Sequence, residues 1–378
     1  MNRRASFAAT TVRTDEVTSV ELPGKPECCW TATAPRTSYP NLAGSQVAEV
    51  VIVGAGIVGV TAAYLLSEAG LSVILLEARR IGRQVTGRST AKITTQHSLI
   101  YRHLIEAFGL ETAQCYADAN LLGMAQISQW VEGLGIVCDL ESKDAYVYCS
   151  HPSRVPDLGA EAEASRKVGL DAELLEAAPL PFSTAGALRS QNQAQFNPAQ
   201  YLIGLAKAAN AAGATIFEET RVTAVEKGES WQLKAGQASV HAENVVLATN
   251  LPIAGPIPYD ERTRPRSHIA MSFRVDPRAA INGMFIGVDE PTHSLRMGRD
   301  DKGPLLRYWA PNSVPVWKAT WRHISAIWKP GHARMSKLPM LHGGGLTRTT
   351  IRPIAYRLSA HRLRRQVFTL PLDSMPGA

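Results

Sequence analysis

The chain has 378 residues, 45% of them hydrophobic, and carries 40 Lys and Arg against 33 Asp and Glu, a formal net charge of +7. The length suggests two domains, and the apolar content is enough for a sizeable core. No run of about 18 apolar residues occurs, so no membrane-spanning helix is predicted.

Residues 1–45 precede the first predicted strand and are interpreted as an N-terminal extension. Arg3 and Arg4 are typical of a twin-arginine export signal, but charged residues interrupt the apolar core that such a signal needs. The five cysteines, of which Cys28 and Cys29 are adjacent, form no C-x-x-C pattern and are interpreted as free thiols in a reducing compartment. We therefore expect a cytoplasmic protein.

An apolar run at residues 51–53 is followed by three glycines with the G-x-G-x-x-G spacing of phosphate-binding βαβ units. Gly54 permits a tight turn, Gly56 lets the backbone approach a pyrophosphate, and Gly59 lets the next helix pack closely. The N-terminus of that helix presents a positive dipole end to the anion. The pattern predicts a dinucleotide site at this turn.

The helix is predicted to end at Gly70, before a second apolar strand at residues 73–76. Its inner face is predicted to consist of four small or apolar side chains, Ala62, Ala63, Leu65 and Leu66. Glu77 follows the second strand, where a carboxylate that binds ribose hydroxyls is expected about 20 residues after the glycines. This acid would repel a 2′-phosphate, so NAD or FAD is favoured over NADP.

Residues 86–94 are rich in small hydroxyl side chains and carry two cations. Here the chain resembles the D-amino-acid-oxidase-like family of FAD-dependent oxidoreductases. Residues 90–94 with Gln96 and His97 resemble the branch that often carries a C-terminal Rieske iron–sulfur domain. The resemblance implies FAD as the cofactor, with this loop along its flavin side.

Later segments extend the resemblance, which covers about residues 28–306. Asn197 and Pro198 open a predicted helix as cap and first residue. Residues 220–226 and 243–250 are predicted strands. The family implies that a valine on the first, here Val222, meets the adenine side of FAD, and that the second returns to the dinucleotide and ends in Ala-Thr. The resulting candidate FAD contacts are Gly54, Gly56, Ile57, Val58, Gly59, Glu77, Ala78, Thr86, Gly87, Ser89, Thr90, Ala91, Val222, Ala248 and Thr249.

The predicted fold class is α/β, with a Rossmann-like FAD-binding domain at 46–100 and 190–255 and an antiparallel-sheet substrate domain at 101–189 and 256–306. The substrate domain is expected to hold a helical region at 101–133. Its strands are expected at 144–148, 267–275, 284–287 and 294–297, the last with a turn at 300–303. The expected core residues of the helical region are Tyr116, Leu121, Leu122, Ala125 and Trp130. In the family this sheet roofs the flavin ring.

The resemblance implies oxidation of a C–N bond in a small amine or amino acid, with O₂ or a redox carrier as electron acceptor. Arg274 and Arg296 are candidates to bind a substrate carboxylate through an arginine fork, or are ordinary strand arginines. His97 is a candidate to contact the flavin or the substrate, or is structural. Tyr146 and Tyr148 share one strand face and line either the pocket or the core. No general base and no metal site are predicted.

Residues 303–378 hold twelve Lys and Arg and one acid, so the net positive charge belongs to this segment. Residues 307–378 form an atypical basic tail with three interpretations. It is a nucleic-acid or membrane arm, an unusual subdomain, or the product of a frame change near residues 302–307. The last is favoured because the resemblance ends there, and nucleic-acid binding is considered unlikely. Cys149 and His151 match only one of the two Cys–His pairs of a Rieske centre, so that domain is expected to be absent. The alternative to an active enzyme is an inactive or unstable truncated family member.

Overall fold

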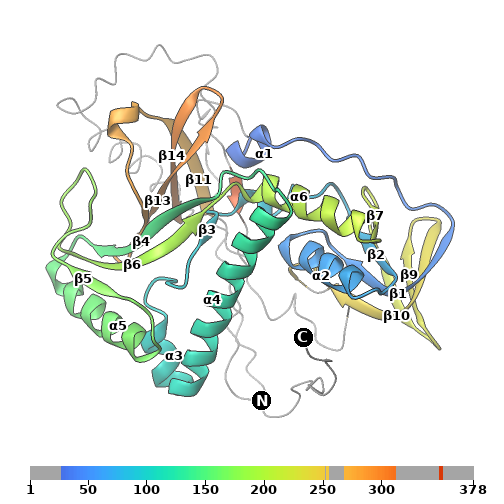
Figure 1. Cartoon of the computed structure of the whole chain (residues 1–378), viewed down its shortest axis with the longest axis horizontal. Coiled ribbons are helices and arrows are strands. Elements are labelled where there is room, and N and C mark those ends of the chain that lie inside the picture. Colours follow the sequence, from blue (N-terminus) through green and yellow to red (C-terminus); the bar gives the residue numbers. More distant parts are fainter. Residues whose placement is uncertain (1–26, 252, 255–267, 312–348, 352–378) are drawn as a thin grey trace, which may run out of the picture.

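The computed structural model describes residues 27–251, 253–254, 268–311 and 349–351 of the chain. Figure 1 shows two lobes, each built on one sheet, with the long helix α4 running between them. The architecture is a mixed α/β fold, as the sequence predicts.

The first lobe contains a six-stranded sheet with the strand order β7-β2-β1-β10-β9-β8. Its strands are β1 (Ser45–Val53), β2 (Val73–Leu76), β7 (Thr215–Phe217), β8 (Ala224–Lys227), β9 (Trp231–Ala235) and β10 (Ala238–Leu247). Four neighbouring strands of this sheet, β7, β2, β1 and β10, run parallel to one another. The last two strands, β9 and β8, add an antiparallel edge. Val50 and Ile52 face one buried cluster while Val51 and Val53 face another, which explains why β1 is apolar from Val50 to Val53.

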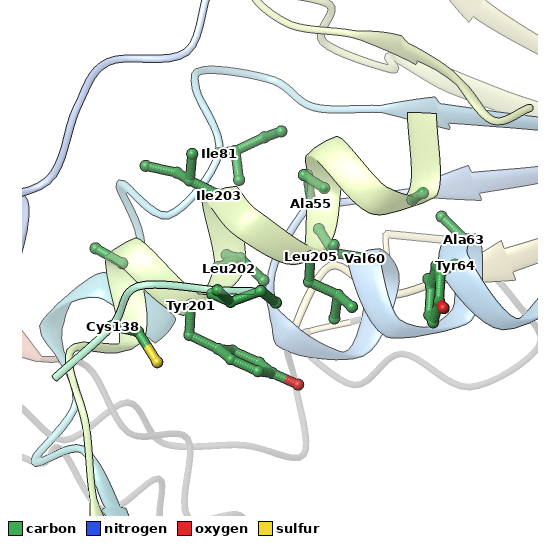
Figure 2. Packing of buried hydrophobic residues seen from close by; sticks show 14 of the residues in the cluster. Ala55, Val60, Ala63, Tyr64, Ile81, Cys138, Tyr201, Leu202, Ile203 and Leu205 are labelled. Atoms are coloured by element: carbon green, nitrogen blue, oxygen red, sulfur yellow. The ribbon is translucent and has the colours of Figure 1, made fainter. Parts of the chain in front are cut away.

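Helices α2 (Ile57–Glu68) and α6 (Pro198–Ala211) cover one face of this sheet. Figure 2 shows Leu202 and Leu205 of α6 packed beside Val60 and Ala63 of α2. The predicted cap of α6 is confirmed, because the Asn197 side chain accepts hydrogen bonds from the two amides of the first turn.

The predicted inner face of α2 is wrong in part. Leu65 is 49% exposed, and Ala62 and Leu66 are only half-buried. The buried residues of α2 are Gly59, Val60, Ala63, Tyr64 and Ser67. These positions follow the i, i+3, i+4, i+7 spacing of a single helical stripe, and Leu65 lies well outside it.

The predicted strand at 220–226 begins only at Ala224. Before that point, the amide of Thr220 donates to the carbonyl of Glu77 at 2.8 Å, and its hydroxyl accepts from the amide of Leu42 at 3.0 Å. These bonds, together with a left-handed backbone at Glu219 (φ 50°), draw residues 220–223 across the end of the sheet instead of along it.

The second lobe contains a nine-stranded sheet with the order β15-β11-β14-β13-β12-β4-β6-β3, and β5 pairs with β6 outside this path. Its strands are β3 (Lys92–Ile93), β4 (Glu141–Cys149), β5 (Glu173–Leu175), β6 (Gly186–Gln195), β11 (His268–Arg274), β12 (Met284–Gly287), β13 (Ser294–Asp300), β14 (Gly303–Pro311) and β15 (Thr349–Ile351). All pairs are antiparallel except β12 with β4. The predicted strands and the β13–β14 hairpin are confirmed. β14 also continues past the expected boundary at residue 306, and the rest of the expected tail, apart from β15, lies outside the described residues.

The helical region predicted at 101–133 is two helices, α3 (Tyr101–Phe108) and α4 (Leu110–Gly133), separated by Gly109 at φ 87°. The predicted core of α4 is largely wrong, because Leu121 and Leu122 are 43% and 72% exposed and Ala125 is also exposed. The buried residues of α4 are Ala113 and Ala117, which lie one turn apart and face α3 and α5. Tyr116 and Trp130 are only half-buried.

The remaining elements are α1 (Cys29–Thr33), α5 (Val155–Lys167) and three short 3₁₀ turns, η1 (Thr86–Arg88), η2 (Pro152–Arg154) and η3 (Pro277–Ala279). Tyr146 and Tyr148 lie in the buried cluster of the second sheet, with Tyr146 stacked on Phe285 at 4.8 Å between ring centroids. They are therefore core residues, one of the two interpretations left open by the sequence.

Candidate FAD-binding site

The carboxyl ends of β1, β2 and β10 meet at a cleft of about 690 Å³. Ten of the predicted FAD contacts line it: Gly54, Gly56, Ile57, Val58, Glu77, Ala78, Thr86, Val222, Ala248 and Thr249. A crevice at the carboxyl edge of parallel strands is where open α/β sheets bind nucleotides. Gly59, Gly87, Ser89, Thr90 and Ala91 do not line this cleft.

Each of the three glycines of the turn is suited to its position for a different structural reason. A Cβ on Gly54, whose φ is 103°, would lie 2.6 Å from the carbonyl oxygen of Ala248. A Cβ on Gly59 would lie 1.9 Å from the carbonyl oxygen of Gly54, so this position needs glycine for the packing of α2 on the turn. At Gly56 the nearest atom is the Thr86 hydroxyl at 3.5 Å, so the missing side chain leaves open space on the cleft. That space is what a pyrophosphate approaching the backbone requires.

The carboxylate of Glu77 is buried at the base of the cleft. It accepts hydrogen bonds from the amide of Ala55 at 2.8 Å and from the amide of Arg79 at 2.9 Å. Each oxygen has a second lone pair left for a ribose hydroxyl. The donor set of a glycine turn and a fixed carboxylate therefore fits a dinucleotide.

Three arginines that the sequence analysis did not propose as site residues also line this cleft. Arg79, Arg80 and Arg221 bring positive charge to it, and Arg80 is paired with Glu219 at 3.1 Å. The signal available in the sequence was the Arg79–Arg80 pair directly after Glu77.

The loop that carries Ser89, Thr90 and Ala91 is held from the second sheet. Arg296 on β13 donates to the carbonyls of Thr90 and Ala91, and Arg307 on β14 donates to the carbonyl of Ser89 at 3.2 Å. The buried indole of Trp30 donates to the same Ser89 carbonyl at 3.1 Å. Three side chains thus fix the backbone of this loop.

The expected role of Arg296 as a carboxylate fork does not agree with its contacts. Its side chain is 3% exposed, and its nitrogens donate to backbone carbonyls, including those of Met297 and Phe196. Burial, and then the charge of Arg307, lower the pKa of Arg296 to about 9. Its donors already have acceptors, so it positions the loop.

Arg274 is also engaged. From β11, its Nη2 contacts both carboxylate oxygens of Asp300, the last residue of β13, at 2.9 and 2.6 Å. Burial would raise the pKa of Asp300, but hydrogen bonds from Arg274 and from the amide of Lys302 hold it below its usual value. This arginine ties β11 to the turn of the β13–β14 hairpin.

His97 interacts with Tyr116 and Lys92, neither of which the sequence analysis proposed as a site residue. Its Nδ1 is 3.0 Å from the hydroxyl of Tyr116. The protein around the ring, and then the charge of Lys92, lower the pKa of His97. Lys92, on β3, donates from Nζ to the carbonyl of Phe285 at 2.9 Å, and burial followed by the charge of Arg296 lowers its pKa to about 7. A lysine among small residues in Thr90–Thr94 was the available signal.

Residues 49–349 match the DAO family, FAD dependent oxidoreductase. The chain belongs to this family. The match runs beyond residue 306, where the resemblance in the sequence was expected to end.

Relatives and solved structures agree with this family. YhfW of Bacillus subtilis (strain 168), named for a Rieske 2Fe-2S iron–sulfur protein, is 31% identical over 275 residues, which are 72% of this chain and 53% of that protein. The gamma-glutamylputrescine oxidoreductase of Escherichia coli (strain K12) is 26% identical over 218 residues, 56% of this chain and 51% of that protein. The L-proline dehydrogenase of P. horikoshii has the same fold, with a TM-score of 0.57 at 19% identity, covering 75% of this chain and 77% of that one. The chain spans about half the length of the curated relatives it matches.

Within the described residues, no helix combines the length and the apolar character that crossing a bilayer requires. The same residues contain no group of three or more His, Cys, Asp or Glu arranged to hold a metal ion.

Proposed function

We propose that this enzyme oxidises a C–N bond of a small amine or amino acid. The family and the cleft support FAD as the cofactor, and the name of one relative, gamma-glutamylputrescine oxidoreductase, points to nitrogen-containing substrates. Bound FAD would supply the hydride acceptor for this reaction. The residues proposed to hold it are those that line the cleft, with Ser89, Thr90 and Ala91 as the flavin-side loop.

The observation that carries the proposal is Lys92. An alkylammonium has no free lone pair to assist hydride loss, so the substrate must first lose a proton. A lysine with a pKa of about 7 is partly neutral at physiological pH and can accept that proton at Nζ. It follows directly on the loop proposed to lie along the flavin, and β12 fixes the direction of its side chain.

The proposed substrate is recognised first through its amine. Arg274 is engaged by Asp300 and Arg296 by backbone carbonyls, so neither of these two arginines offers a fork to a substrate carboxylate. His97, whose pKa responds to the charge of Lys92, and Tyr116, which is hydrogen-bonded to His97, are polar groups that can relay the proton to solvent.

An anaerobic titration tests the proposal. Protein loaded with FAD is mixed with a panel of primary amines, secondary amines and amino acids, and the visible flavin band is followed. Bleaching by one class, with release of the matching carbonyl compound, supports the proposal. A flavin band that persists with every class of amine refutes it. Reoxidation by O₂ or by an added redox carrier then identifies the electron acceptor.

A further inference from the structure

Two adjacent thiols lie beside a buried cation at the N-terminal end of the described chain. Arg307 Nη1 is 2.9 Å from Cys29 Sγ and 3.4 Å from Cys28 Sγ. The exposed fractions of Cys28, Cys29 and Arg307 are 5%, 6% and 4%. Burial alone would lower the pKa of Arg307, but the charges of the two thiols raise it. Among the described residues, Arg307 donates hydrogen bonds to these two sulfur atoms and to the carbonyl of Ser89.

Two buried cations lie close to the pair. Arg307 and Arg296 both lie over the ring of Trp30, at 4.5 and 4.8 Å from its centroid. On β11, Ser272 is hydrogen-bonded to Cys29. Two buried guanidinium groups thus meet two thiols, and one ionised thiol reduces the uncompensated buried charge.

The two thiols are not equivalent. A hydrogen bond from Cys29 lowers the pKa of Cys28 well below its usual value, and Arg307 adds to this against the opposing effect of burial. The same hydrogen bond raises the pKa of Cys29. Arg307 lies nearer to the Cys29 sulfur but contacts both sulfur atoms, so the two thiols share its positive charge. A second negative charge beside the first is disfavoured, so the contacts of Arg307 support one thiolate in the pair, and the hydrogen bond from Cys29 favours Cys28 as its place.

We propose that Cys28 is a nucleophilic thiolate, with Cys29 as its resolving thiol, and that the pair is a site of oxidation by hydroperoxides. The Cys28 thiolate attacks a peroxide oxygen, the O–O bond breaks, and a sulfenic acid forms while hydroxide leaves and is protonated to water. The Cys29 sulfur then attacks the Cys28 sulfur, the S–O bond breaks, and the thiol proton leaves with the hydroxide as a second water. In sum, two thiols lose two electrons and two protons, and one hydrogen peroxide becomes two waters.

The disulfide formed in this way is readily reversed. Adjacent Cα atoms are about 3.8 Å apart across a trans peptide, below the roughly 4.4 Å at which ordinary disulfides begin. Strained disulfides are the reducible ones. A small dithiol reductant therefore restores the pair.

The test is peroxide treatment of the reduced full-length protein, followed by alkylation and digestion with trypsin. One peptide, residues 14–36, carries both Cys28 and Cys29, because the Lys25–Pro26 bond resists trypsin. At pH 7 this peptide is expected to lose two hydrogens roughly tenfold faster than exposed Cys115 is oxidised, because the thiolate is the reacting form. Oxidation of Cys115 while peptide 14–36 keeps two alkylatable thiols overturns the proposal.

The pH dependence gives a second readout that needs no variant. Between pH 8 and pH 6, oxidation of an ordinary thiol slows about tenfold for each pH unit. Oxidation of a thiolate held by Arg307, with Arg296 alongside, slows by less than about threefold over the whole range. A tenfold loss per unit at peptide 14–36 contradicts the proposal.

Two variants identify the nucleophile. In Cys29→Ser the resolving thiol is gone, so a sulfenic acid accumulates on Cys28 and is trapped by dimedone. In Cys28→Ser no rapid oxidation of the peptide remains. Cys138→Ser is the matched control, because Cys138 is a buried thiol whose pKa burial raises to about 11, and its loss leaves the oxidation unchanged. Absence of a dimedone adduct on Cys28 in folded Cys29→Ser refutes the assignment.

Discussion

Replacing Gly56 with alanine separates cofactor binding from folding. Gly56 has an ordinary φ of −81°, and an added Cβ would meet only the Thr86 hydroxyl at 3.5 Å, an ordinary contact. The free energy of unfolding of the FAD-free protein is therefore expected to change by no more than about 0.5 kcal/mol. The new methyl group projects into the cleft where the pyrophosphate is proposed to approach, so the dissociation constant for FAD is expected to rise at least about tenfold, or about 1.4 kcal/mol.

Gly70→Ala is the matched control. Gly70 has φ 83° with nothing within 4 Å of an added Cβ, and it lies at the far end of α2 from the cleft. Left-handed backbone costs a non-glycine residue about 1–2 kcal/mol, so this variant should lose stability without losing FAD affinity. Thermal unfolding and titration of FAD fluorescence measure the two quantities. A Gly56→Ala protein that binds FAD as tightly as the wild type refutes the proposed placement of the pyrophosphate.

Four further results are expected. Glu77→Gln should weaken FAD binding about tenfold in dialysis and lower the free energy of unfolding by about 1–3 kcal/mol, because only one side-chain oxygen remains to accept from ribose and from the amides of Ala55 and Arg79; unchanged affinity would exclude the ribose contact. Lys92→Met should lower kcat/KM for the amine about 100-fold or more. It should also remove the limb near pH 7 of the pH–rate profile, where the rate rises as Lys92 loses its proton. A limb that persists in the variant would show that another group titrates there. Arg296→Met should lower the free energy of unfolding by about 1–3 kcal/mol in urea, because the buried carbonyls of Thr90 and Ala91 lose their donor; a selective rise in KM for carboxylate-bearing substrates would instead assign Arg296 to substrate binding. The pKa of Asp300 is lower in the folded protein than in the unfolded chain, so its contribution to stability is present above the unfolded-state pKa and is lost as pH falls through the folded-state pKa. Asp300→Asn should remove this part of the acid sensitivity of unfolding. Identical acid unfolding curves for the variant and the wild type would show that the pair with Arg274 contributes nothing.

The first lobe could be predicted because its signals are local. The glycine turn, the strand at 73–76 and the Asn197 cap each follow from rules that act over a few residues, and all three are present in the structure. The β13–β14 hairpin was predicted for the same reason, because the residues typical of its turn follow one another directly in the sequence.

The errors concern partners that are distant in the sequence. Whether Leu122 is buried depends on which face of α4 meets α3 and α5, and an apolar residue alone does not decide this. Arg296 lies opposite Arg307 in the sheet and reaches back about 200 residues to the loop at Thr90 and Ala91. The low pKa of Lys92 likewise arises from enclosure by β12 and from Arg296, which no local pattern contains.

The central claim is that the cleft at the ends of β1, β2 and β10 holds FAD. The most direct measurement is the absorbance spectrum of the protein after incubation with excess FAD and gel filtration, with the protein concentration determined independently. A flavin band that corresponds to one FAD per chain is predicted. A protein that unfolds cooperatively yet emerges colourless from the column would contradict the account.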